Sequence, residues 1–153
     1  MTEEQLEKLN KIKVDPDKFQ NLERLNCGKI LGIDYGTKNV GLALSDQEQK
    51  QAFVYDTLKM SDKLFVEIKE ICDKEEVDRI VVGLPLNLKG EYTQKTEEVV
   101  MFIGQLEEEV KIAVEFEDER FSSTEAEKRG GGHGIDESSA QIILQQYLDK
   151  LNN

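Results

Sequence analysis

The sequence predicts an α/β domain: a mixed five-stranded sheet with helices on both faces. Short apolar runs of branched residues, separated by turn residues, occur five times and are typical of strands. Stretches with apolar residues at helical spacing separate the later runs. The predicted order is β-β-β-α-β-α-β-α-α, in which a hairpin series is followed by β-α units. A chain of 153 residues is long enough for one such domain with a buried core.

The first three strands are predicted from a hairpin and the segment that follows it. An apolar run over 30–33 ends in Asp34, the chain turns through 35–39, and a second apolar run follows over 40–44. Residues 51–57 predict the third strand, because a short polar turn separates them from the second.

Two helix–strand units are predicted next. Ser61 is a suitable N-cap for an amphipathic helix that ends near Cys72. The continuous apolar run 79–84 predicts a central strand covered on both faces. A second helix carries the apolar stripe from Val99 to Val110, and the alternating segment 111–117 predicts the fifth strand.

The two ends of the chain are predicted to be helical. A capping-box pattern over 122–125 predicts a short helix that stops at the glycines of 130–134. Residues 1–27 read as a helical N-terminal extension, which leaves residues 28–153 as the main domain. The last helix begins near Glu137 and is expected to bury Ala140, Ile143, Leu144, Tyr147 and Leu151.

The composition limits the classes of partner. The formal net charge is −12, from 32 acidic and 20 basic residues, which disfavours broad attraction to nucleic acid or membranes. Any contact with nucleic acid therefore has to come from a local group of cations. Cys27 and Cys72 lack metal-ligand spacing and are expected to be buried thiols of a reducing compartment. No apolar run approaches the ~20 residues needed to span a bilayer, so we expect a cytoplasmic protein without a membrane partner.

Three carboxylates fall at the ends of different predicted elements. Asp34 ends the first strand, Asp118 follows the fifth, and Asp136 opens the last helix. Each also has a structural interpretation. Asp34 is suited to a turn that bonds the backbone of Gly36, Asp118 to the start of a turn, and Asp136 to an N-cap.

The three carboxylates together indicate a metal site. In sheets covered by helices, ligands collect beyond the carboxyl ends of the strands. Carboxylates brought together there repel one another unless a divalent cation neutralises them, and Mg²⁺ accepts one or two carboxylates per ion. Two such ions about 3.5–4 Å apart would activate a water and stabilise the leaving oxygen of a phosphodiester.

Four blocks of this sequence resemble the signature segments of the YqgF family. They are GIDYGTKNVG (32–41), VGLPLN (82–87), DERFSS (118–123) and DESSA (136–140), in that order. Family members are ribonuclease H-like proteins described as Holliday junction resolvases and as nucleases that mature the 5′ end of pre-16S rRNA. The resemblance covers about residues 29–151.

The resemblance implies a ribonuclease H-like fold and metal-dependent hydrolysis by Asp34, Asp118 and Asp136. The implied cofactor is a pair of Mg²⁺ or Mn²⁺ ions. Many ribonuclease H-like nucleases place a carboxylate near the end of the fourth strand, where this chain has Gly83-Leu84-Pro85. Asp118 or Glu119 would have to substitute for it, and Asp118 is preferred because strand alternation puts it on the side of Phe116. The implied partners are pre-rRNA or branched DNA, and ribosomal precursor particles.

Several further residues have expected roles near the carboxylates. Thr37 and Lys38 are placed to touch a phosphate or to solvate the turn, and Arg120 to hold a phosphate or form an ion pair. Asn87 is expected to shape the strand-end loop and donate hydrogen bonds to substrate. His133, three residues before Asp136, is better explained as an exposed side chain than as a catalytic one.

Two other classes of function fit parts of the pattern. Asp-x-Gly-Thr beside a hairpin also begins sugar kinases and actin-like ATPases, although those proteins need two lobes. A ribosome-assembly or RNA-binding protein that keeps the fold without cutting fits the acidic composition. The three carboxylates favour the nuclease.

Overall fold

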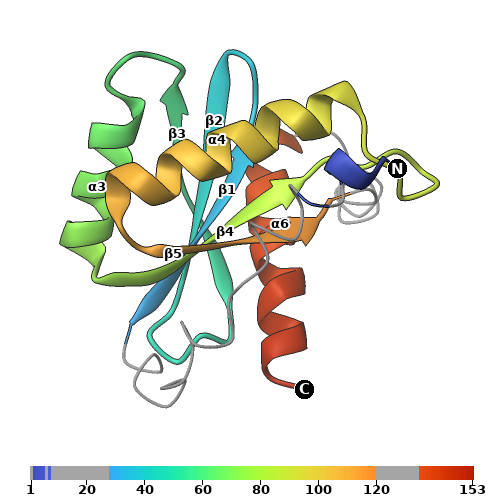
Figure 1. Ribbon diagram of the computed structural model, residues 1–153. Helices are drawn as coiled ribbons and strands as arrows, with labels where there is room; N and C mark the ends of the chain where they lie inside the picture. Colours follow the sequence, from blue (N-terminus) through green and yellow to red (C-terminus); the bar gives the residue numbers. More distant parts are fainter. Residues whose placement is uncertain (1, 6, 8–27, 120–134) are drawn as a thin grey trace.

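The computed structural model describes residues 2–5, 7, 28–119 and 135–153, and the side chains of the last segment from Ser139 onward. Its centre is the predicted mixed five-stranded sheet, with helices on both faces (Figure 1). The strands are β1 (Lys29–Tyr35), β2 (Asn39–Ser45), β3 (Ala52–Lys59), β4 (Val77–Leu84) and β5 (Ala113–Asp118), and the principal helices are α3 (Leu64–Glu75), α4 (Gln94–Val110) and α6 (Ile135–Leu151).

The strand order is β3-β2-β1-β4-β5. β1 pairs antiparallel with β2, and β2 antiparallel with β3, as the hairpin series predicts. β4 lies parallel to β1 on one side and to β5 on the other. The carboxyl ends of β1, β4 and β5 therefore meet at one edge of the sheet, which we call the carboxyl edge.

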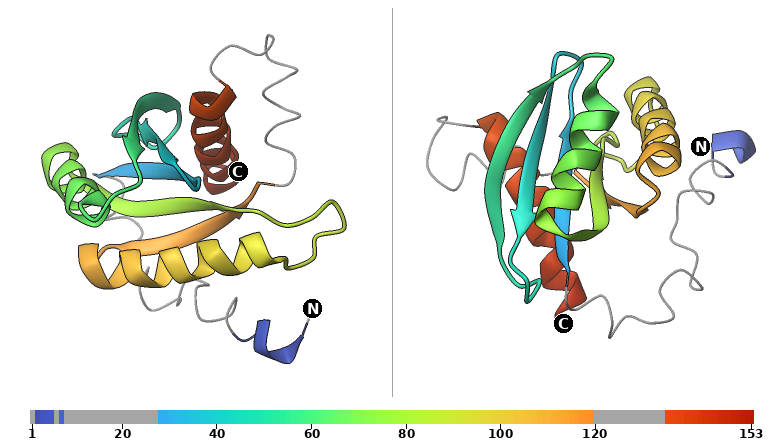
Figure 2. Two further views of the ribbon diagram at one scale, coloured as in Figure 1. Left: turned by 90° about the horizontal axis from the view of Figure 1, so that it is seen from above. Right: turned by 90° about the vertical axis from the view of Figure 1, so that its left-hand side faces the viewer.

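Side-chain alternation divides the core into two layers. Leu31 and Ile33 of β1 face α3 and α4, within the larger cluster of buried side chains. Ile30 of β1 faces α6, with Val81 of β4 in the smaller cluster. Figure 2 shows this arrangement, with α4 and α6 on opposite sides of the sheet. Residues of even number in β1 and odd number in β4 therefore face α6.

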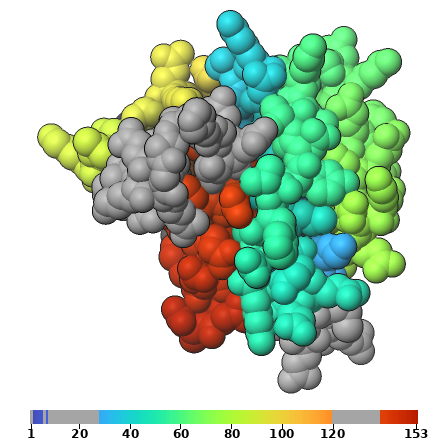
Figure 3. Space-filling model, turned by 180° about the vertical axis from the view of Figure 1, so that it is seen from behind, coloured from blue at the N-terminus to red at the C-terminus, as the bar shows by residue number. Residues whose placement is uncertain are grey.

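Gly32 sets how closely α6 approaches the sheet. A Cβ on this glycine would lie 2.7 Å from the Cβ of Leu144, closer than real contacts allow. α6 also lies alongside the edge strand β3, as Figure 3 shows. There the backbone N–H of Ala52 donates to Gln145 Oε1 (2.9 Å), and Gln141 Nε2 donates to the carbonyl of Ala52 (3.1 Å).

The structure corrects two details of the expected helices. Ser61 is not the N-cap of α3. The cap position is Lys63, and the Ser61 hydroxyl accepts from the Lys63 N–H in the preceding turn (3.2 Å). In α6, Leu151 is the last residue of the helix and is exposed, and the buried leucine at this end of the helix is Leu148. The predicted N-terminal helices, apart from residues 2–5 and 7, and the predicted helix and glycines over 122–134 lie outside the described residues.

Cys72 is a buried free thiol, as expected. Loss of hydration raises its pKa to about 12, and the charge of Asp73 adds to this, so the thiol is not a nucleophile at neutral pH. Cys27 lies outside the described residues. Among the helices that the structure describes, none has the length and apolar character to cross a bilayer.

Candidate active site at the carboxyl edge

Asp34 and Glu119 come together at the carboxyl edge. Asp34 is the next-to-last residue of β1, two residues after Gly32, so alternation directs it to the α6 face. Glu119 follows β5, and its backbone N–H donates to the carbonyl of Leu84 (3.2 Å), which extends the pairing of β5 with β4. The two side chains form a hydrogen bond.

Proximity to Asp34 changes the ionisation of Glu119. Burial, the charge of Asp34 and the hydrogen bond that protonated Glu119 donates to the Asp34 carboxylate together raise the pKa of Glu119 to about 8. The ammonium of Lys95 acts in the opposite direction and lowers the pKa. In the metal-free protein the pair therefore holds one proton at neutral pH.

Gly83 makes room for the Glu119 carboxyl group. A Cβ on Gly83 would lie 2.9 Å from Glu119 Oε2 and 2.4 Å from Ile143 Cδ1 of α6. The Glu119 carboxyl group thus lies over the end of β4, between that strand and α6. This position agrees with the expectation from the resemblance that Asp118 or Glu119 substitutes for a carboxylate near the end of the fourth strand.

Asp118, the preferred second carboxylate from the sequence, lies on the other face of the sheet. It pairs in register with Leu84, and Leu84 and Phe116 both pack in the layer of α3 and α4. Alternation directs Asp118 to the same side as Phe116 and away from α6. The structure thus brings Asp34 to Glu119, the alternative that the sequence left open, rather than to Asp118.

Asp136 is the second residue of α6, and its side chain lies outside the described part of the structure. Its position in the helix is one turn before Ala140, which is fully buried against β1 and β4. Arg120 and His133 also lie outside the described residues, so the structure does not place their side chains.

Thr37 and Lys38 line a pocket of about 200 Å³ beside Asp34. Both are exposed in the turn between β1 and β2, and Thr57 of β3 closes the far side. Thr37 and Lys38 thus share a pocket with Asp34, and their contact with a phosphate stays a prediction.

Asn87 organises the loop after β4. Its Oδ1 accepts from the backbone N–H groups of Lys89 (3.0 Å) and Glu91 (2.9 Å), and its Nδ2 donates to Glu91 Oε1 (3.3 Å). The structure thus gives Asn87 the loop-shaping part of its expected role, and its contact with substrate stays a prediction.

Lys95 is a candidate that sequence reasoning missed. It is exposed in the first turn of α4, and its charge acts on Glu119. The N-terminal end of a helix carries a partial positive charge, which disfavours a lysine in the first turn. A lysine at this position of the predicted helix was therefore the sequence signal for a functional role. Its ammonium adds a positive charge next to an otherwise acidic pair.

The donor atoms at this edge fit a divalent cation. Asp34 and Glu119 supply only oxygen ligands, which suit Mg²⁺ and Mn²⁺. The charge of Asp34 raises the pKa of Glu119, and a divalent cation between the two carboxylates would relieve their repulsion. Among the residues that the structure describes, no group of three or more His, Cys, Asp or Glu side chains is placed to hold a metal ion.

The raised pKa of Glu119 predicts an unusual dependence of stability on pH. Between about pH 4.5 and 8 folded Glu119 keeps a proton that unfolded Glu119 has lost, so this group's contribution to the free energy of unfolding falls as pH rises. With EDTA present, Glu119→Gln should therefore stabilise the protein relative to wild type by about 2–4 kcal/mol at pH 8.5 and much less at pH 4.5. Urea unfolding at both pH values measures this, with the exposed Glu108→Gln as the matched control. Equal shifts for both variants would contradict the assignment.

Comparisons with known proteins agree with the fold. The family model for RuvX, described as Holliday junction resolvase, matches residues 28–150. A relative from Maridesulfovibrio salexigens named "Putative pre-16S rRNA nuclease" is 42% identical over 131 residues, which are 78% of this chain and 97% of the relative. A relative of the same name from Caldanaerobacter subterraneus is 38% identical over 139 residues, which are 82% and 99% of the two chains.

Solved structures share the fold at low sequence identity. RuvC from Thermus thermophilus in complex with a Holliday junction substrate superposes with a TM-score of 0.57 at 12% identity, over 82% of this chain and 96% of that one. The fold is therefore the ribonuclease H-like fold of the RuvC resolvases, as the resemblance implied. With the family match and the curated relatives, these findings confirm the identification from the four sequence blocks: the chain belongs to the RuvX family.

Proposed function

We propose that this protein is a divalent-metal-dependent endonuclease that hydrolyses phosphodiester bonds of structured RNA, with the 5′ end of pre-16S rRNA as its substrate. The observation that carries the proposal is the Asp34–Glu119 pair, two acidic side chains held against each other at the carboxyl edge. The names of the curated relatives support the choice of substrate.

Asp34, Glu119 and Asp136 are the proposed metal ligands, with Asp118 as the sequence-based alternative to Glu119. Asp34 and Glu119 lie on the α6 face, and Asp136 is the second residue of the helix that covers this face. Two Mg²⁺ or Mn²⁺ ions held there would supply an activated water and stabilise the leaving oxygen of the phosphodiester.

Cations around the pair hold the substrate in this proposal. Lys38 and Thr37 contact a phosphate on the hairpin side, and Lys95 approaches from the first turn of α4. Arg120, which follows Glu119 in the chain, holds an adjacent phosphate, and the Asn87 loop borders the site. Because the whole chain carries a net charge of −12, binding depends on this local group of cations.

A four-way DNA junction is the second candidate substrate. The matching family is described as Holliday junction resolvase, and the RuvC structure of similar fold contains such a junction. The chemistry at the carboxylates is the same for both substrates. Action on ribosomal precursor particles in the cytoplasm belongs to the RNA form of the proposal.

One assay tests the proposal. The full chain is incubated with end-labelled pre-16S rRNA fragments and with four-way DNA junctions, each with Mg²⁺, Mn²⁺ or EDTA. We expect discrete cleavage of the RNA with either metal and none with EDTA. Cleavage of the DNA junction alone would contradict the RNA substrate and favour the DNA junction as the substrate.

Parallel measurements separate the remaining classes. ATP hydrolysis without nucleic-acid cleavage would favour a nucleotide-binding module and contradict the proposal. Tight RNA binding with no cutting under any metal would favour a non-catalytic assembly factor, and would contradict it as well.

A further inference from the structure

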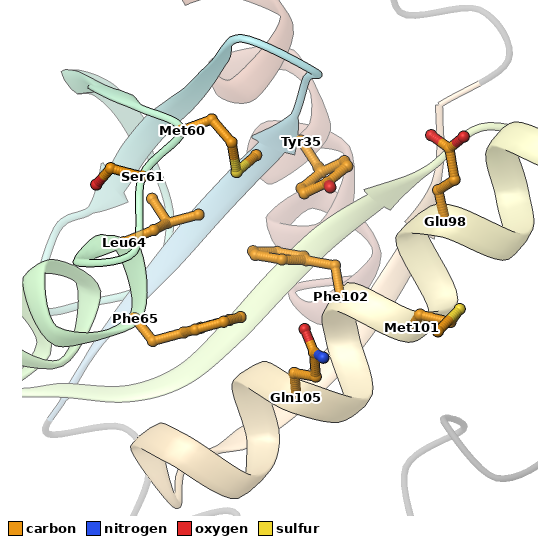
Figure 4. A pocket seen from close by; sticks show the side chains of 9 residues that line it. All are labelled: Tyr35, Met60, Ser61, Leu64, Phe65, Glu98, Met101, Phe102 and Gln105. Carbon is orange, nitrogen blue, oxygen red and sulfur yellow. The ribbon is translucent and has the colours of Figure 1, made fainter.

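A second pocket lies at the carboxyl edge, on the face away from Asp34 and Glu119. It has a volume of about 270 Å³ and opens between the start of α3 and the middle of α4. Figure 4 shows the rings of Phe65 and Phe102 between these helices, with Tyr35 at the end of β1 beside them. The hydrolysis proposed above for either substrate does not involve this pocket.

The pocket presents aromatic surface in a fixed arrangement. The ring centroids of Tyr35 and Phe102 are 4.5 Å apart, and those of Phe65 and Phe102 are 5.7 Å apart with nearly parallel planes. Phe102 is buried, but Tyr35 and Phe65 are only partly covered, and Met101 on the rim is 60% exposed. Aromatic rings that are already packed and still partly open are suited to receive another flat ring.

Polar side chains occupy the rim of the pocket. Glu98 and Gln105 come from α4, and Ser61 comes from the turn before α3. Glu98 is exposed and negatively charged, so the rim repels a phosphate and accepts hydrogen bonds from amino groups. The lining therefore matches a nucleobase, which needs stacking on its face and hydrogen bonds at its edge, better than a charged backbone group.

The pocket adjoins the proposed catalytic site. Tyr35 follows Asp34 directly, and alternation turns their side chains to opposite faces of the sheet. The backbone N–H of Met60, on the pocket wall, donates to the carbonyl of Lys38 in the turn that lines the pocket beside Asp34 (2.9 Å). The two pockets are therefore neighbours at the end of β1, one on each face of the sheet.

We propose that this pocket binds one unstacked base of the nucleic-acid strand, next to the phosphodiester held at Asp34 and Glu119. The proposal rests on the proposed function, which it extends by naming a base-binding subsite. Tyr35 and Phe65, the two partly exposed rings, supply the stacking surface, and Glu98 selects bases with an exocyclic amino group, such as cytosine or adenine, over uracil or thymine.

An abasic scan tests the subsite. A series of the cleaved substrate carries one abasic residue at each position near the cut. We expect a single position, within two nucleotides of the cut, where loss of the base lowers kcat/KM about 10- to 100-fold, the range of one stacked base. The Tyr35→Leu variant should show the same loss on the intact substrate and no further loss on the abasic one.

Surface variants guard against effects on folding. Met101→Ala should lower kcat/KM about three-fold or more with the intact substrate, whereas the matched exposed residue Val66→Ala on α3 should leave it unchanged. Glu98→Gln should reduce discrimination between cytosine and uracil at the identified position. A scan without any sensitive position, in an enzyme that cuts normally, would overturn the subsite and leave the proposed function intact. This is also the result that a groove for a protein partner would give.

A binding measurement keeps the subsite testable if cleavage fails. A single-stranded oligonucleotide with 2-aminopurine at successive positions is titrated with the full chain, and stacking quenches its fluorescence. Quenching at one position that is lost in Tyr35→Leu supports the subsite even where neither substrate is cut. Quenching that Tyr35→Leu and Met101→Ala both leave unchanged would overturn it.

Discussion

Replacing Glu119 by Gln should reduce metal-dependent cleavage about a thousand-fold or more, and Asp34→Asn should do the same. A metal ion contributes several kcal/mol of transition-state stabilisation, and each 1.36 kcal/mol corresponds to a ten-fold change in rate. Removing one anionic oxygen from the pair weakens the hold on the ion and its alignment. Single-turnover cleavage with saturating Mg²⁺ measures the loss.

Asp118→Asn is the matched control, because it makes the same change in charge at the neighbouring position. Asp118 lies on the face of α3 and α4, so its variant should retain cleavage within a few-fold of wild type. A large loss in Asp118→Asn with little change in Glu119→Gln would restore the sequence-based choice. It would also require the end of β5 to rearrange when metal binds.

Leu144→Ala should lower the free energy of unfolding by about 2–5 kcal/mol, the range for truncation of a fully buried leucine. Leu144 has no exposed surface, and its Cβ packs against Gly32 in the middle of β1. Gly32 has no side chain that could fill the cavity left by the substitution. Chemical denaturation monitored by circular dichroism measures the change.

Leu88→Ala provides the comparison, since Leu88 is 77% exposed in the loop after β4 and should change stability by less than about 0.5 kcal/mol. Leu144→Ala also loosens the helix that begins with Ile135 and carries Asp136. Cleavage should therefore become sensitive to temperature well below the unfolding midpoint. Equal stability of the two variants would contradict the packing of α6 described above.

Much of the fold follows from the sequence because its signals are local. The hairpin, the apolar run of β4 and the one-sided stripe of α4 each fall within a dozen residues, and each formed as predicted. The N-cap position at Lys63 and the exposure of Leu151 depend on how α3 and α6 meet the sheet, which no local pattern reports.

The site was predicted less completely because its pairings are non-local. Whether Asp118 or Glu119 meets Asp34 depends on which face of β5 packs against α6, and both faces carry acidic residues. The glutamates on the α6 face are held by other partners: Glu115 accepts from the Tyr147 hydroxyl, and Lys150 pairs with Glu117. The position of Lys95 near Glu119 depends on the orientation of α4 relative to β4, which the sequence does not show.

The opposite orientations of Asp34 and Tyr35 have a consequence for the shape of any substrate that uses both pockets. Such a strand must straddle the rim of the sheet, with its backbone on one side of β1 and a base on the other. Regular double helices are far too stiff to fold over an edge so narrow, whereas frayed termini, bulges and crossover points bend there at little cost. Selection for branched or unpaired regions would then follow from the thickness of a single β-sheet, without any reading of sequence.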